Sequence, residues 1–320
     1  MTPIFIFSLP RSGSTMLQRM LMGSNEVASY SEPWVLLHLL SGLKEGGGVS
    51  IYSNSTAIRA FGDFIGNMEG GRGKYNELTK SYVESMYESS CKNGEVYFLD
   101  KTPRYYLVID EIAEIFPNAK FIFLFRRPEQ VFSSILSTWG GARLRNLHPY
   151  EIDLKLGMTC LSSAYEKYKH RSVAVNYESL VSKPEKTLME LCKYLAIVYT
   201  DELLSGLSKV VPGGRAGDPT GIVEYQAVSM SSIDKWKKVI DSWYKKRILM
   251  RYLNEIPSKV YEVQGYDKEG VMSDIQSIRT RRLGLLDLKD HLLSVFIRRT
   301  NVNILLGKVI NPSVKSVHLS

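Results

Sequence analysis

The sequence predicts an α/β fold in which helices flank a central parallel sheet. Short apolar runs, typical of strands buried on both faces, alternate along the chain with stretches of helical periodicity, and the clearest runs are 4–7 and 120–125. The first run passes through a turn of small residues, 8–15, directly into the helical pattern of 16–21. Strands that alternate with helices in this way form βα units, which join parallel strands.

The composition indicates a globular protein with one catalytic domain and appendages. The chain has 320 residues, of which 44% are hydrophobic and 23% are charged, and this is ordinary for a domain that buries a sizeable core. No stretch approaches the roughly 20 apolar residues of a membrane span. The first apolar run is too short for a signal peptide and lacks its basic start, so we expect a cytoplasmic protein.

The cysteines and the net charge bear on whether the chain has disulfides, a metal site or a nucleic-acid partner. Cys91, Cys160 and Cys192 are widely separated, with no histidine at metal-ligand spacing, so we expect buried thiols and neither disulfides nor a metal. Of the net charge of +8, the segment from Arg279 onward carries +6, from eight Lys or Arg and two Asp residues. No nucleic-acid-binding motif accompanies this charge, so we expect no nucleic-acid partner.

The turn 8–15 has the composition of a phosphate-binding loop. Gly13 and the serines let successive amide groups point into one concavity, and the positive end of the following helix points there too. The turn departs from the nucleotide-triphosphate pattern GxxxxGK[ST], because Ser8 replaces the first glycine and Ser14 replaces the lysine. Arg11 is then the cation within the turn, which favours a single phosphate over three.

Residues 10–15 read PRSGST and resemble the 5′-phosphosulfate loop of sulfotransferases that use 3′-phosphoadenosine 5′-phosphosulfate (PAPS). The resemblance implies a P-loop sulfotransferase-like three-layer fold, PAPS as co-substrate and 3′,5′-ADP (PAP) as product. It also implies that five loop residues contact PAPS, namely Arg11, Ser12, Gly13, Ser14 and Thr15.

Glu32 follows the expected short strand 27–30 and precedes the helical stretch 35–43. A carboxylate at this place can simply complement the helix dipole. Carbohydrate sulfotransferases carry a similar Glu-Pro pair after the first helix, and this resemblance implies that Glu32 is the general base.

Lys101 follows the expected strand 96–99 and therefore lies at the carboxyl edge of the sheet, where ligands bind in open parallel sheets. Cytosolic sulfotransferases have Lys-Thr-His at a similar place, with the lysine on the departing phosphate and the histidine as base. Here Pro103 replaces that histidine, which strengthens the case for Glu32. The resemblance implies catalytic roles for Lys101 and Arg11.

A second motif follows the strand 120–125, where Pro128 starts the helix 129–138. Family members pair an arginine with a serine eight residues later to hold the 3′-phosphate, and here these residues are Arg126 and Ser134. An arginine fork suits a dianionic phosphate. Two motifs in the family's order are the main basis of the resemblance, which extends discontinuously over 4–266.

Three further residues are candidate nucleotide contacts. Tyr177 follows the expected strand 173–176 and resembles the tyrosine that contacts the adenine region, although a tyrosine after a strand is often plain core. Ser231 and Ser232 begin a helical pattern, one of them as N-cap, and resemble a segment that closes over the nucleotide. Whether these two serines touch the nucleotide stays open.

The remaining segments are predicted from periodicity and from helix breakers. Helices are expected at 75–90, 108–116, 150–169 and 184–195. Glycine-rich breaks at 46–48 and 70–73 predict mobile surface loops that border an acceptor cleft, and the five glycines and two prolines of 206–221 predict a lid.

We expect a sulfotransferase catalytic domain over 1–268 and a basic helical extension over 269–320. The expected reaction is in-line transfer of the sulfuryl group from PAPS to a hydroxyl acceptor, for which a carbohydrate or glycolipid is favoured, without a metal. Two alternatives remain, a P-loop small-molecule kinase and a catalytically silent nucleotide-binding scaffold. The acceptor's identity and the oligomeric state are left open by the sequence.

The extension contains apolar residues at helical spacing between 285 and 296, interrupted by basic residues. One hypothesis is that its apolar face packs on the enzyme's own core. The competing hypothesis is that a basic amphipathic helix makes peripheral contact with an anionic membrane or binds a partner.

Overall fold

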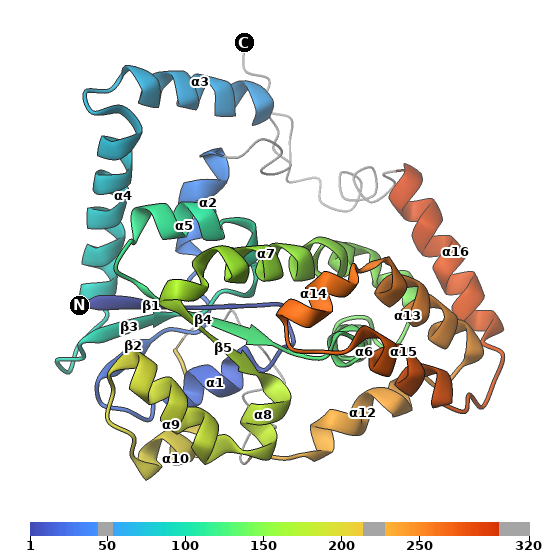
Figure 1. Cartoon of the computed structure of the whole chain (residues 1–320). Helices are drawn as coiled ribbons and strands as arrows, with labels where there is room; N and C mark the ends of the chain where they lie inside the picture. The colour runs from blue at the N-terminus through green and yellow to red at the C-terminus, as the bar shows by residue number, and fades with distance from the viewer. Residues whose placement is uncertain (44–53, 214–227, 301–320) are drawn as a thin grey trace.

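The computed structural model describes residues 1–43, 54–213 and 228–300 (Figure 1). Its centre is a five-stranded sheet in the order β2-β3-β1-β4-β5, with every neighbouring pair parallel. The strands are β1 (Thr2–Ser8), β2 (Val27–Ser29), β3 (Tyr97–Asp100), β4 (Lys120–Phe125) and β5 (Ser172–Asn176). The expected strands are therefore confirmed, with small shifts at their ends.

The two faces of the sheet carry different side chains because successive residues of a strand point to opposite faces. One face is aromatic and includes Phe5, Phe7, Phe121, Phe123 and Phe125. The other is aliphatic and includes Ile4, Ile6, Ile122, Leu124 and Val175. Both faces are buried, as the continuous apolar runs predicted.

Helices cover both faces and make a three-layer structure, so the predicted fold class is confirmed. The helices of the first part are α1 (Ser14–Leu21), α2 (Val35–Leu40), α3 (Asn54–Asn67), α4 (Gly71–Glu88), α5 (Ile109–Ile115), α6 (Pro128–Thr138) and α7 (Met158–Tyr168). Those of the second part are α8 (Tyr177–Ser182), α9 (Pro184–Leu195), α10 (Asp201–Lys209), α12 (Ser231–Val239), α13 (Trp243–Glu255), α14 (Ser258–Val263), α15 (Lys268–Ser277) and α16 (Leu285–Thr300). Helices α1, α8, α9 and α10 pack on the aliphatic face, and α5, α6, α7, α13 and α14 pack on the aromatic side.

Short turns of other helix types connect these elements. They are η1 (Ser41–Leu43), η2 (Pro103–Leu107), η3 (Leu144–Asn146), η4 (His148–Tyr150), η6 (Lys169–Arg171) and the π-helical turn η5 (Asp153–Gly157), which leads into α7. No helix in the described ranges is both long and apolar enough to pass through a bilayer.

The structure corrects two expectations about glycine-rich segments. The break at 70–73 is the start of α4, where Gly70 is the N-cap with φ 79°, and α3 precedes it. Gly206 lies within α10 rather than in a lid, and a Cβ there would come within 2.6 Å of the Arg19 carbonyl oxygen on α1. This glycine permits close helix packing instead of flexibility. Residues 46–48 and 214–221 of these expectations lie outside the described ranges.

Two further expectations fail, one at the start of α12 and one on the apolar face of α16. The N-cap of α12 is Met230, and Ser231 and Ser232 are its first residues. Helix α16 contacts α13 and η3, but its leucines face solvent and its aspartates face the protein. For the apolar side chains described between 285 and 296, the hypothesis that this face packs on the core is therefore wrong. The domain boundary at residue 268 stays a prediction.

Candidate active site

In the turn between β1 and α1, two residues have positive φ angles, and only one of them is a glycine. Gly13, the N-cap of α1, has φ 91°, and a Cβ there would lie 2.4 Å from the Tyr177 ring. Arg11 also has a positive φ, 65°, although it carries a side chain. Such conformations are costly for non-glycine residues and persist where the surroundings impose them, often at functional sites.

Helix α1 positions the chain that carries Glu32. The buried amide of Gln18 donates from Nε2 to Ser29 Oγ at 2.7 Å and to the Tyr30 carbonyl oxygen at 2.8 Å. Ser29 Oγ donates in turn to the Leu99 carbonyl oxygen on β3 at 2.5 Å. Gln18 Nε2 also lies 3.3 Å from the Ser31 carbonyl oxygen, so these bonds fix the three residues before Glu32 between α1 and the sheet.

Glu32 and Lys101 form a buried ion pair at the carboxyl edge of the sheet. Lys101 Nζ donates to Glu32 Oε1 at 2.8 Å and to Thr15 Oγ1 at 3.4 Å, and the lysine side chain is fully buried. Glu32 Oε2 accepts from the indole Nε1 of Trp34 at 3.3 Å. The ion pair therefore brings the predicted base and the predicted cation to the first turn of α1. Glu32 itself precedes α2, which begins at Val35.

A second buried carboxylate lies beneath this pair. Asp100 accepts hydrogen bonds from the hydroxyls of Tyr87 at 2.5 Å, Tyr105 at 2.8 Å and Thr102 at 3.2 Å. Burial raises the pKa of the Asp100 carboxyl to about 6, although the three hydroxyl donors act in the opposite direction. The network fixes the backbone from which Lys101 projects.

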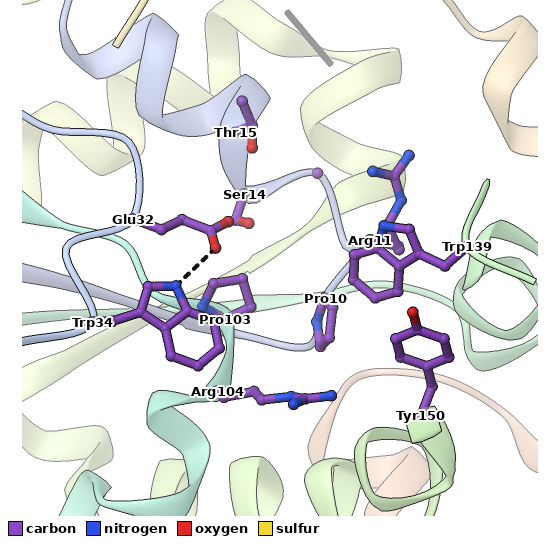
Figure 2. Close-up of a pocket in the computed structure, with 11 residues that line it drawn as sticks. Pro10, Arg11, Ser14, Thr15, Glu32, Trp34, Pro103, Arg104, Trp139 and Tyr150 are labelled. Carbon is purple, nitrogen blue, oxygen red and sulfur yellow. Dashed lines mark hydrogen bonds between the residues drawn. The ribbon is translucent and has the colours of Figure 1, made fainter. Parts of the chain in front are cut away.

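Glu32 of this ion pair lines a cavity of about 250 Å³, called here the first cavity (Figure 2), whereas Lys101 is fully buried behind it and is not a lining residue. Its lining residues are Pro10, Arg11, Gly13, Ser14, Thr15, Glu32, Trp34, Pro103, Arg104, Trp139 and Tyr150. Figure 2 shows Glu32 and Trp34 on one side and Trp139 and Tyr150 on the other. The predicted loop and base therefore meet in one cavity.

Aromatic rings and two arginines form the walls of the first cavity. Trp139 and Tyr150 are stacked, with ring centroids 4.8 Å apart, and the Arg11 guanidinium lies 5.8 Å from the Trp139 ring. Arg104 is held by the fully buried Asp153, to which its Nε and Nη2 donate at 3.2 and 2.9 Å. Flat apolar surfaces beside fixed cations suit a ring-shaped ligand that carries hydroxyl or acidic groups.

A second cavity of about 190 Å³ lies on the other side of Arg11. Its lining residues are Arg11, Arg126, Gln130, Ser133, Ser134, Ser137, Thr138, Ser232, Lys235, Trp236 and Val239. Arg11 lines both cavities and donates from Nε to Ser134 Oγ at 3.3 Å. The two predicted phosphate motifs therefore meet at this arginine.

Arg126 connects the elements around the second cavity. It donates to Gln130 Oε1 at 3.0 Å, to the Arg11 carbonyl oxygen at 2.8 Å and to the Ser232 carbonyl oxygen at 3.4 Å. The guanidinium also lies 4.0 Å from the Tyr177 ring centroid. A guanidinium has five N–H donors, so Arg126 orders the loop and keeps donor capacity for an anion.

Two buried polar atoms in the second cavity suit a ligand. Gln130 Nε2 and Ser133 Oγ have no hydrogen-bond partner among the described residues, and both side chains are 2% exposed. Buried polar atoms are nearly always paired in a working protein, because an unpaired one costs about 1–3 kcal/mol. An anion with several acceptor oxygens beside Arg126 would satisfy both atoms.

The other predicted nucleotide contacts have distinct places. Tyr177 is 1% exposed, wedged between Gly13 and Arg126, and its hydroxyl pairs with Ser232 Oγ at 2.7 Å. Ser12 is also buried and lines neither cavity. The side chain of Ser231 lies outside the described part of the chain. Direct contact of these residues with a nucleotide stays a prediction.

Sequence reasoning assigned no role to several lining residues, namely Trp34, Arg104, Trp139, Tyr150, Gln130, Ser133, Lys235 and Trp236. Arg104 had a usable signal, because it closely follows Lys101 at the carboxyl end of β3. Trp34 had none, since its φ of 58° is visible only in three dimensions. Within the described ranges no group of three or more His, Cys, Asp or Glu side chains could hold a metal; the expectation of metal-free chemistry stays a prediction.

Comparisons with known proteins concern the family and the fold. The family model described as Sulfotransferase family matches residues 3–201. The nodulation protein NoeE of Sinorhizobium fredii is 24% identical over 73% of this chain and 59% of its own length. Protein-tyrosine sulfotransferase 1 of Danio rerio is 25% identical over 80% of this chain and 67% of its own length. The chain therefore spans about three fifths to two thirds of the length of these two relatives.

A solved structure supports the fold. The "Sulfotransferase Domain from the Curacin Biosynthetic Pathway" matches with a TM-score of 0.50 and 22% identity, over 79% of this chain and 96% of that domain. At this identity, the likeness concerns the three-layer fold and not the acceptor.

Proposed function

This chain belongs to the sulfotransferase family, and we propose that it transfers a sulfuryl group from PAPS to a hydroxyl group in the first cavity. The observation that carries the proposal is that Arg11 lines both cavities. A ligand with a phosphosulfate at one end and a 3′-phosphate at the other can then span both cavities past one cation. An ATP-dependent kinase leaves the second cavity unexplained.

The residues present fit PAPS. The loop around Gly13 and the first turn of α1 would hold the 5′-phosphosulfate, and Arg126, Ser134, Gln130 and Ser133 would hold the 3′-phosphate. PAPS supplies the activated sulfuryl group when bound. The rest of the chemistry falls to side chains of this chain.

Lys101 and Arg11 would balance negative charge as it grows on the departing phosphate. Lys101 Nζ already lies 3.4 Å from Thr15 Oγ1 at the start of α1, so its charge is fixed at the place where the phosphate binds. Preorganised cations of this kind contribute on the order of 10²-fold or more to the rate.

Glu32 would accept the proton of the acceptor hydroxyl. Its carboxylate lines the first cavity and is oriented by Lys101 on one oxygen and by Trp34 on the other. A base held in this way contributes about 10²- to 10⁴-fold.

The favoured acceptor is the hydroxyl of a carbohydrate or glycolipid. The Glu-Pro pair resembles that of carbohydrate sulfotransferases, and the stacked rings of Trp139 and Tyr150 give a flat apolar surface for one face of a sugar ring. Arg104 would donate to hydroxyl or acidic groups of the same sugar.

A second candidate acceptor is a tyrosine side chain. It is favoured by the match to protein-tyrosine sulfotransferase 1 and by the same aromatic walls, which suit a phenol ring in offset or edge-to-face contact. Transfer of labelled sulfate from PAPS to a panel of oligosaccharides, glycolipids and tyrosine-containing acidic peptides separates the two. Labelling of neither class, with PAP still bound, would favour the silent scaffold.

Nucleotide binding is tested by calorimetry and by thermal stabilisation. We expect PAP to bind and raise the melting temperature much more than ATP does, and Arg126→Ala to weaken the effect of PAP, because a charge-assisted contact is lost. Arg59→Ala, on α3 and remote from both cavities, is the matched control. Equal stabilisation by ATP and PAP would contradict the assignment of the second cavity.

The role of Glu32 is tested by Glu32→Gln, which keeps the shape of the side chain and removes its basicity. We expect PAP affinity to be retained and turnover to fall about 10²- to 10⁴-fold. Glu190→Gln, at an exposed position of α9, is the control. Near-normal turnover in Glu32→Gln would leave Glu32 with a structural role only.

A further inference from the structure

Helix α16 turns polar side chains toward the protein and apolar side chains toward solvent, which is the reverse of an ordinary surface helix. Among residues 285–296, whose side chains the structure describes, the buried ones are Asp287, Asp290 and Ser294, each 4% exposed. Its large apolar residues are exposed, by 74% at Leu285, 66% at Leu286, 36% at Leu288, 59% at Leu292, 40% at Leu293 and 57% at Phe296. A surface helix normally buries the opposite stripe.

Specific polar contacts hold the helix in this orientation. Asp290 accepts two hydrogen bonds from Arg143, at 2.9 Å from Nε and 2.7 Å from Nη2. Asp287 accepts from Ser242 Oγ at 2.7 Å and lies 3.9 Å from Lys245 Nζ, which is 4% exposed. Rotating the helix to bury its leucines would break all of these polar contacts. The contacts therefore hold the apolar face toward solvent.

The outward face combines leucines with one central cation. Lys289 is exposed, and its neighbours at three and four residues on either side are Leu285, Leu286, Leu292 and Leu293. Next to the helix, Leu283 is 72% exposed and Trp243 is 47% exposed, and the Trp243 amide donates to the Arg282 carbonyl oxygen. The exposed apolar surface therefore continues beyond α16, and we call it the α16 face.

The exposed charge around the α16 face is mainly positive, and the part-exposed Asp241 beside it is paired with Lys245 and Arg282. Both aspartates of the helix are buried and paired, whereas Lys289, Arg279 and Arg281 are exposed. An apolar stripe flanked by exposed cations is the pattern of a helix that lies in the interface of an anionic bilayer. Lysine stems can lie along apolar surface while the ammonium reaches the headgroups, and tryptophan also favours that boundary.

A second copy of this chain fits the α16 face less well. In a two-fold interface the face meets its own copy, so the central Lys289 would be buried against leucines or against another lysine. A buried cation without a partner is strongly unfavourable. We propose that the α16 face binds the surface of a membrane that contains anionic phospholipid, with α16 parallel to the bilayer plane.

Flotation of the full chain with vesicles tests the proposal. We expect binding to vesicles of phosphatidylcholine with phosphatidylglycerol in low salt, and much weaker binding to phosphatidylcholine alone. The double variant Leu286→Glu with Leu292→Glu should lower the partition coefficient about 100-fold, since two leucines are lost from the contact with the bilayer and two carboxylates are repelled by the anionic headgroups. Lys289→Gln should lower it about fivefold in low salt and less in high salt.

The controls separate this surface from general apolar exposure. Met189 and Val198 are 52% and 72% exposed and lie on or next to α9, away from α16 in Figure 1. Met189→Glu with Val198→Glu should float like the unchanged chain. The α16 variants should keep their unfolding temperature because the replaced leucines are already exposed.

Three results would overturn the proposal. One is that the full chain fails to float with anionic vesicles in low salt. Another is that the Leu286→Glu and Leu292→Glu variant floats as well as the unchanged chain. The third is that the full chain is a dimer by light scattering, that this variant is a monomer, and that neither floats, which would assign the α16 face to a second copy. Because no PAPS or acceptor is added, none of these results depends on the proposed function.

Discussion

Helices α1 and α16 have similar sequence patterns and opposite orientations. Both carry Leu, Met or Phe at helical spacing among polar residues. All eight residues of α1 are buried, and its apolar side chains pack on the aliphatic face of the sheet. In α16 the leucines face solvent and two aspartates face the protein.

The difference shows what periodicity alone can predict. Spacing of 3.6 residues defines a helix and its two faces, but the partners available in the fold decide which face is turned inward. Helix α1 meets an apolar sheet face, whereas α16 meets Arg143 and Lys245. The same pattern therefore gives a rigid support for the active site in one place and a candidate docking face in the other.

The largest effect on stability is expected in α1. Leu17→Ala removes a side chain with 0% exposure from the core, and such a cavity costs about 2–5 kcal/mol. Denaturant unfolding monitored by tryptophan fluorescence measures this cost. A cost below about 0.5 kcal/mol would mean that α1 is packed no better than α16.

A pH effect distinguishes the buried carboxylate of Asp100, near α1, from that of Asp290 in α16. Burial raises the pKa of Asp100 to about 6, so the folded chain binds this proton more tightly than the unfolded chain does. Its stabilising contribution is present below about pH 4 and is lost as the pH rises through about 6, an effect of about 3 kcal/mol. Asp100→Asn should remove this part of the pH dependence of unfolding, and an unchanged profile would contradict the assignment.

Asp290 of α16 should respond to pH in the opposite direction. Hydrogen bonds from Arg143 lower the pKa of the Asp290 carboxyl, so its contribution is present above the ordinary carboxylate pKa and is lost as the pH falls through the folded value. At neutral pH, Asp290→Asn should speed amide hydrogen exchange in α16 and in residues 139–150, with a smaller global loss than Leu17→Ala. Exposed Asp63→Asn on α3 is the control; exchange that rises equally over the whole chain would argue against a local attachment.

The smallest effect is expected from Leu292→Ala, the counterpart of Leu17→Ala in α16. The leucine is 59% exposed, so the free energy of unfolding should change by less than about 0.5 kcal/mol. A cost of several kcal/mol would show that the α16 face is covered in solution, and light scattering would then report whether a second copy covers it.

Much of the fold could be predicted from sequence because strands buried on both faces read as continuous apolar runs. The loop around Gly13 was also predictable, since its composition and its place between strand and helix are local properties. Arg126 and Ser134 were predicted as a pair, and the structure places both at the second cavity. Their contact with a nucleotide stays a prediction.

Other features depend on contacts between distant segments and left no local signal. Glu32 and Lys101 are 69 residues apart, and neither sequence context indicates that they form an ion pair. Trp34, Trp139 and Tyr150 meet in one cavity only because two loops converge. Gly206 looked like a flexible position because its contact with α1 is absent from the sequence.

The bidentate contact between Arg143 and Asp290 has a consequence for how surface attachment and catalysis are connected. Arg143 lies between Trp139 and Tyr150 in the chain. The segment that forms one wall of the first cavity therefore also holds α16 through Asp290. A coupling free energy between two sites acts equally in both directions. An acceptor that orders Trp139 and Tyr150 would therefore raise the affinity of α16 for the membrane. A membrane that immobilises α16 would raise the affinity for the acceptor by the same factor. Such an enzyme would bind an acceptor at the membrane surface more tightly than the same acceptor in solution.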